Sequence, residues 1–158
     1  MSFSPQSRVW IYQSDRKFSQ SEETAILNKL EGFTTQWKAH GNELLASAEI
    51  RYGFFIILTV DETQANVTGC SIDSSVRIIK EIEQEYNVDL FNRFNLAYRV
   101  NNEVVVNSKE DFETLVNIKQ ITPDTIVFNN MVQTLAELES KWEVAFRDSW
   151  HSTVFPLY

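Results

Sequence analysis

The chain has 158 residues with 14 basic and 22 acidic side chains, so its formal net charge is −8. It contains only four glycines, one cysteine and two histidines. The glycines, at positions 32, 41, 53 and 69, lie too far apart for any two to share a dinucleotide fingerprint or a phosphate-binding loop. One cysteine and two histidines cannot complete a zinc site of four Cys and His ligands. The composition thus excludes these two common classes of site.

The charge and the apolar pattern also bear on compartment and partners. Residues 1–9 contain no apolar signal segment, and the longest apolar run, Phe54–Leu58, is far shorter than the ~20 residues that cross a bilayer. We therefore expect a cytosolic protein without membrane insertion, where a single cysteine stays reduced. The negative net charge repels phosphate backbones, so we expect no nucleic-acid partner.

The first elements are a strand and a helix. Residues Arg8–Gln13 are β-branched and aromatic, which favours a strand. Ser19 and Glu22 form a capping-box pattern that starts a helix. Its apolar stripe follows the helical period and consists of Ile26, Leu30, Phe33 and Trp37. Gly41 stands where a left-handed C-cap would end this helix.

Two strands and a second helix follow. Leu44–Arg51 and Phe54–Asp61 flank Tyr52-Gly53, where glycine supplies the positive φ of a turn. The second strand is apolar on both faces, which predicts a central, doubly buried strand. Three candidate N-caps, Ser71, Asp73 and Ser74, precede a helical stripe that ends near Asn87.

The last part of the chain predicts a hairpin and short elements. Leu96–Val100 and Glu103–Val106 flank Asn101-Asn102, which tolerate the left-handed geometry of a tight turn. A helix capped by Ser108, a short strand at 125–128 and a helix after Thr134 follow. For residues 144–158 the sequence leaves helix and extended chain open.

This order of elements predicts an α+β fold. The first hundred residues match a ferredoxin-like split βαβ core with a mainly antiparallel sheet, in which the first and third strands are central. A β-hairpin strand and C-terminal helices are added to that core. Without an internal repeat or a linker, residues 1–158 are expected to form a single domain.

The loop before the second helix carries the candidate ligand site. It contains Asp61, Gly69, Cys70, Ser71 and Asp73. A strand that leads into a helix N-terminus favours ligand binding, because free amides and the helix dipole attract anions. A thiol at this point is also a candidate nucleophile. The structural alternative is that Ser71 or Asp73 is only an N-cap and Cys70 a small buried hydrophobe.

These observations favour a small binding or accessory module, with an unidentified small molecule or protein as partner. One alternative is a thiol-dependent enzyme in which His40 or His151 acts as base for Cys70. Another is a structural homodimer that buries an apolar sheet face. Asp61, Glu62 and Asp73 are oxygen ligands by type, but they fit a solvated acidic loop, and we expect neither a metal nor a cofactor. Trp142, Trp150 and Phe155 are expected to pack in the core.

Six segments carry a resemblance to a known group of proteins. They are residues 12–16, 49–52, 60–62, 69–73, 91–93 and 149–151. On these segments the chain resembles a family of short uncharacterised bacterial proteins sometimes labelled ABC-transporter ATPases. The resemblance implies no catalytic residue. Because the chain has no glycine-lysine phosphate loop, we do not expect it to be an ATPase.

Overall fold

A computed structural model describes residues 3–63 and 65–156. These residues form two compact units. Unit 1 comprises the chain up to Phe91 together with the return segment Gln133–Ala136, and unit 2 comprises Asn92–Val132 and the chain from Glu137 on. The expectation of a single domain therefore stays a prediction.

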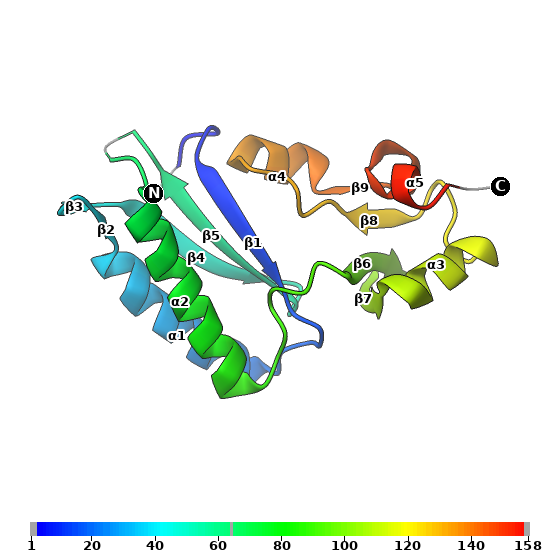
Figure 1. The fold of residues 1–158 in the computed structure, drawn as a ribbon, viewed down its shortest axis with the longest axis horizontal. Helices are drawn as coiled ribbons and strands as arrows, with labels where there is room; N and C mark the ends of the chain where they lie inside the picture. The colour runs from blue at the N-terminus through cyan, green and yellow to red at the C-terminus, as the bar shows by residue number, and fades with distance from the viewer. Residues whose placement is uncertain (1–2, 64, 157–158) are drawn as a thin grey trace. The chain divides into compact units, whose positions relative to one another are not determined.

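Unit 1 is built on a three-stranded antiparallel sheet. The strands β1 (Arg8–Gln13), β4 (Leu45–Arg51) and β5 (Phe55–Asp61) lie in the order β1-β5-β4 (Figure 1). All seven residues of β5 are buried, which confirms the doubly buried central strand. Tyr52 and Gly53 both have positive φ in the β4–β5 turn, as the hairpin requires. The homodimer alternative is not tested by a single chain and stays a prediction.

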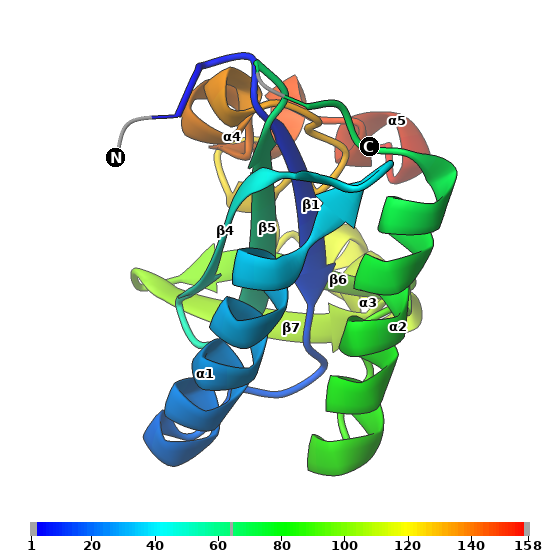
Figure 2. The same cartoon turned by 90° about the vertical axis from the view of Figure 1, so that its left-hand side faces the viewer.

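Two helices, α1 (Gln20–Gln36) and α2 (Gly69–Tyr86), cover one face of this sheet (Figure 2). Ile26 and Leu30 of α1 and Ile79 and Ile82 of α2 pack with the sheet residues Tyr12, Ile56 and Leu58. Ser19 caps α1 with the predicted capping box. Asn87 ends α2 in left-handed geometry, also as predicted. Apolar periodicity and short-range capping thus account for this layer.

The end of α1 differs from the prediction. The helix stops at Gln36, and Trp37 is extended. Two short strands, β2 (Lys38–Ala39) and β3 (Asn42–Glu43), form a hairpin whose turn residues His40 and Gly41 have φ of 51° and 80°. Gly41 is therefore a hairpin residue and not a helix cap. Two consecutive positive-φ residues are the requirement of a tight hairpin turn.

Unit 2 contains a four-stranded sheet and short helices. Its strands, in the order β7-β6-β8-β9, are β6 (Asn95–Val100), β7 (Glu103–Ser108), β8 (Ile126–Phe128) and β9 (Glu143–Ala145). The remaining elements of the chain are the helices α3 (Lys109–Asn117) and α4 (Leu135–Lys141), the 3₁₀-helix η1 (Phe146–Asp148) and the helix α5 (His151–Val154). The core of unit 2 includes the buried side chains of Phe112, Val127, Phe146 and Phe155. Trp142 and Phe155 are buried, as expected.

The α+β class, the antiparallel sheets and the C-terminal helices are confirmed. The prediction that the first strand is central is wrong, because β1 lies at the edge of the order β1-β5-β4. The β1–α1–β4 unit with β5 between its strands is present, but the strand after α2 does not pair with β1. It is β6, which belongs to the sheet of unit 2. In place of a fourth strand, β1 has a single bridge between Arg8 and Thr134.

Candidate functional site

An open hollow of about 610 Å³ lies at the start of α2, within unit 1. It is lined by Lys38, His40, Thr68, Gly69, Cys70, Ser71 and Ser74. One wall is the β2–β3 hairpin, and the other is the first turn of α2 with its N-cap. We call it the α2 hollow. Segments about 30 residues apart in the sequence therefore meet around one space.

The first turn of α2 is fixed by a reciprocal cap. Thr68 is the N-cap: its Oγ1 accepts from the Ser71 amide at 3.2 Å, and the Thr68 amide donates to Ser71 Oγ at 2.6 Å. The prediction of the N-cap is therefore wrong for all three candidates, Ser71, Asp73 and Ser74. Threonine supplies the cap because its hydroxyl reaches the amide three residues on. Gly69 and Cys70 consequently lie inside the helix, at its first two positions.

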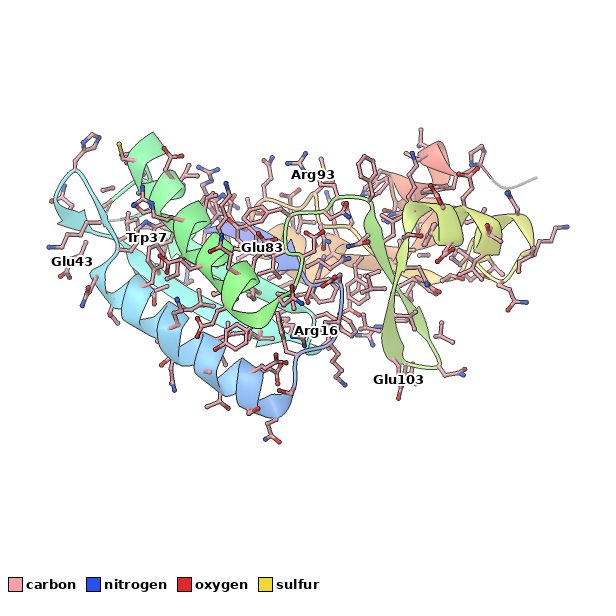
Figure 3. All side chains as sticks on the ribbon, turned by 60° about the horizontal axis from the view of Figure 1, so that its bottom comes forward. Arg16, Trp37, Glu43, Glu83, Arg93 and Glu103 are labelled. Carbon is pink, nitrogen blue, oxygen red and sulfur yellow. The ribbon has the colours of Figure 1, made fainter. Side chains whose placement is uncertain are left out.

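Trp37 connects the two walls of the α2 hollow. Its indole Nε1 donates a buried hydrogen bond of 2.8 Å to the carbonyl oxygen of Ser71, and its own carbonyl accepts from the Leu44 amide at 2.9 Å. Figure 3 shows Trp37 beside the first turns of α2, with Glu43 at the same end of the unit. The contact ties the hairpin that carries Lys38 and His40 to the helix start.

The lining of the α2 hollow has an unusual charge for this acidic chain. Among the described residues that line it, Lys38 carries the one formal charge, and none is a carboxylate. Within the described residues, the amides of Gly69 and Cys70 have no hydrogen-bond acceptor. The amides of a first helical turn carry the positive end of the helix dipole. Glu43 is the residue opposite Lys38 in the β2–β3 register and carries a negative charge.

Cys70 is exposed, so the interpretation of this residue as a small buried hydrophobe is wrong. His40 is exposed as well and lines the same hollow. Sequence spacing alone cannot show that the two side chains share a space, because they belong to different elements. The position of His40, one of the two candidate bases for Cys70, is thus compatible with the thiol-enzyme alternative.

His151 has a different environment. The side chain is fully buried in unit 2, its Nδ1 lies 2.7 Å from Ser149 Oγ, and its ring stacks on Trp150 at 3.8 Å between centroids. Burial lowers the pKa of His151 from 6.5 to about 4, because an imidazolium loses its hydration. These surroundings keep the His151 ring neutral inside the core of unit 2. They give no support to His151 as the base for Cys70, and that alternative stays a prediction.

Asp61 and Asp73 are not among the residues that line the α2 hollow. The Asp61 carboxylate accepts from the amides of Ser4 and Thr63 at 2.9 and 3.0 Å, and these two bonds lower its pKa. Asp73 is exposed on the next turn of α2. Asp61 therefore orders the start of the loop that leads to α2.

Three lining residues, Lys38, Thr68 and Ser74, were not predicted as site residues. Lys38 belongs to a two-residue strand, which is too short to give a periodic pattern. The dipeptide His40-Gly41 could nevertheless have indicated a hairpin turn next to it. Thr68 forms a Thr-x-x-Ser box, a weaker pattern than Ser/Thr-x-x-Glu. Over the described ranges 3–63 and 65–156, no three Cys, His, Asp or Glu side chains gather closely enough to hold a metal ion.

The comparisons with known proteins give no family for this chain. It matches no family model and has no significant similarity to the curated proteins or the solved structures with which it was compared. In the described part of the chain no helix is both long and apolar enough to cross a bilayer.

Proposed function

We propose that this protein is a small cytosolic binding or accessory module and that the α2 hollow takes a small anionic ligand. One observation carries the proposal: Lys38, His40 and the first residues of α2 line one open space, and no described residue of its lining is acidic. Helix N-termini bind anions through free amides and the dipole. A lysine on the facing wall adds a full charge to that field.

Cys70 provides a direct probe of the potential in the α2 hollow. Two methanethiosulfonate reagents of similar size, one with a sulfonate and one with a quaternary ammonium group, form the same kind of disulfide with the thiol. We expect the ratio of the rate with the anionic reagent to the rate with the cationic reagent to be higher for Cys70 than for a free small thiol. The preference should fall several-fold in Lys38→Gln and should weaken at high salt, because exposed charges are screened.

Lys80→Gln is the matched control. Lys80 lies on the same helix, ten residues after Cys70 and therefore about 15 Å along the axis, which exceeds the ~8 Å screening length at physiological salt. It should leave the reagent preference unchanged. If the preference for the anionic reagent fell equally in Lys38→Gln and Lys80→Gln, it would depend only on the net charge of the protein, and the proposal would be contradicted.

Ligand binding is tested with inorganic phosphate as the probe. In an NMR titration the amide signals of Gly69 and Cys70 should shift with saturation, and Lys38→Gln should weaken the binding. Glu43→Gln should strengthen it, because it removes the carboxylate opposite Lys38. Linear shifts of the same size over the whole surface would be non-specific and would refute an anion site in the α2 hollow.

The thiol-dependent enzyme is the second candidate, because His40 and Cys70 line the same hollow. A base acts on a thiol only within hydrogen-bond reach. The test is the rate of alkylation by neutral iodoacetamide as a function of pH. If His40 activates the thiol, His40→Gln moves the profile to higher pH. Identical profiles, with half-maximal rates at or above pH ~8.5, the ordinary thiol value, would reject this candidate.

A further inference from the structure

The residues Ser149, Trp150 and His151 form a polar cluster within the core of unit 2. Two side-chain nitrogens of the cluster, Trp150 Nε1 and His151 Nε2, are buried and have no hydrogen-bond partner among the described residues. The described part of the chain has only one other such atom, Ser7 Oγ in unit 1. Two neighbouring residues that both lack a partner call for a physical account, because the large majority of buried side-chain polar atoms in proteins are hydrogen-bonded.

The hydrogen bond to Ser149 determines what the His151 ring can offer. Ser149 Oγ lies 2.7 Å from His151 Nδ1. Because Ser149 Oγ has no other side-chain hydrogen-bond partner among the described residues, we assign its hydroxyl proton to the bond with Nδ1. In a neutral imidazole the ring proton is then on Nε2. His151 Nε2 and Trp150 Nε1 are therefore both N–H donors.

The two rings that carry these donors lie against each other. The rings stack with centroids 3.8 Å apart and planes inclined by 20°, and an oxygen atom can accept two hydrogen bonds. The surroundings are apolar: Phe112 lies 5.8 Å from the His151 ring between centroids and packs with Phe146 and Phe155. An unpaired anion in such a setting would lose its hydration at high cost. The acceptor should therefore be neutral.

We propose that an internal water molecule accepts hydrogen bonds from Trp150 Nε1 and His151 Nε2 and is a structural part of the core of unit 2. Buried waters occur in proteins about once per 27 residues and satisfy polar groups of this kind. The triplet Ser149-Trp150-His151 then has one role for each residue: the serine fixes the tautomer, and the other two bind the water. This site is independent of the α2 hollow.

The test replaces Trp150 with β-(3-benzothienyl)alanine, which keeps the shape of the indole and replaces N–H by sulfur. If an acceptor is present, the replacement breaks a hydrogen bond and lowers Tm. If none is present, it removes an unsatisfied donor and raises Tm. The matched control is the same replacement at Trp142, whose Nε1 donates to Asn130 Oδ1 at 2.8 Å. There Tm should fall.

Water itself is detected by NMR. A cross-peak between water and the Trp150 indole proton, absent for the Trp142 indole proton, is the expected result. A higher Tm at position 150 would overturn the proposal. A lower Tm without the water cross-peak would overturn it as well, because the acceptor would then be a group of the protein.

Discussion

The indole nitrogen of Trp37 donates a buried hydrogen bond of 2.8 Å to the carbonyl oxygen of Ser71, across 34 positions of the sequence. The ring also packs edge-on against Trp10, with centroids 6.2 Å apart. One side chain at the end of α1 thus sets the distance between the β2–β3 hairpin and the start of α2. It does so without being part of the lining of the α2 hollow.

Trp37→Phe keeps an aromatic ring but removes this hydrogen bond. We expect a loss of about 1 kcal/mol in the free energy of unfolding from the bond, with a further loss from the smaller ring. Cys70 should also react faster with a neutral thiol-reactive compound, because the hydrogen bond no longer holds the β2–β3 hairpin against the first turn of α2. Trp10→Phe is the control: it reduces the packing on Trp37 and the contact of the Arg8 guanidinium with the ring, but leaves the Trp37–Ser71 hydrogen bond in place. An unchanged Cys70 rate in Trp37→Phe would contradict the positioning role.

Gly32 and Gly53 should respond to alanine in opposite directions. Gly32 lies inside α1 with open space around the position of a Cβ atom, so Gly32→Ala should stabilise the protein by about 1 kcal/mol. Gly53 has a φ of 73°, and a Cβ atom would lie 2.9 Å from Lys17 Cγ. Gly53→Ala should therefore destabilise it by about 1 kcal/mol or more. Urea unfolding of both variants measures the two signs, and a destabilised Gly32→Ala would refute the account of α1.

Arg16 and Glu22 form a two-point ion pair, with N–O distances of 2.9 and 2.8 Å, and Arg16 Nη2 also donates to the Tyr86 carbonyl at 2.7 Å. Figure 3 shows Arg16 at the end of α2 opposite Trp37. The guanidinium, with the Ser19 amide, lowers the pKa of Glu22 to about 2. In Arg16→Gln we expect this pKa to rise toward the ordinary value of about 4.3. A carboxyl-detected NMR titration measures it.

The lowered pKa of Glu22 also determines how the free energy of unfolding changes in acid. The folded pKa of Glu22 is below the unfolded one, so the contribution of the pair is complete above pH ~4.3 and is lost as the pH falls toward 2. Arg16→Lys keeps a charge but not the two-point geometry and should show an intermediate Glu22 pKa. A Glu22 pKa that is the same in wild type and Arg16→Gln would exclude the ion pair as the cause.

His151 should make unit 2 sensitive to mild acid. Its pKa is lowered from 6.5 to about 4 by burial, so above pH 6.5 both folded and unfolded states hold it neutral. As the pH falls from 6.5 to 4, only the unfolded state takes up the proton. The free energy of unfolding should fall by about 3 kcal/mol over this window. The comparison of wild type with His151→Asn, by urea unfolding at pH 7 and pH 4.5, isolates this slope. His40→Gln, at an exposed position, should retain it.

The sequence by itself determined the elements whose signals lie within a few residues. Ser19 and Glu22 cap α1, Asn101 and Asn102 make the β6–β7 turn with positive φ, and Asn87 ends α2. Capping and turn chemistry act over three or four residues, so the pattern suffices. The apolar residues on both faces of β5 likewise predict its central place, because burial of both faces requires them.

Tertiary structure alone decided which strand pairs with which and which side chains share a space. The β6 segment has the pattern of a strand, but its pairing with β7 and β8 rather than β1 depends on packing far along the chain. The meeting of Lys38 with Cys70, and the burial of His151, depend on the same long-range packing. Three residues of the candidate segment 69–73, Gly69, Cys70 and Ser71, line the hollow from the start of α2 and could be found from the sequence. The wall opposite them could not, because its residues come from another element.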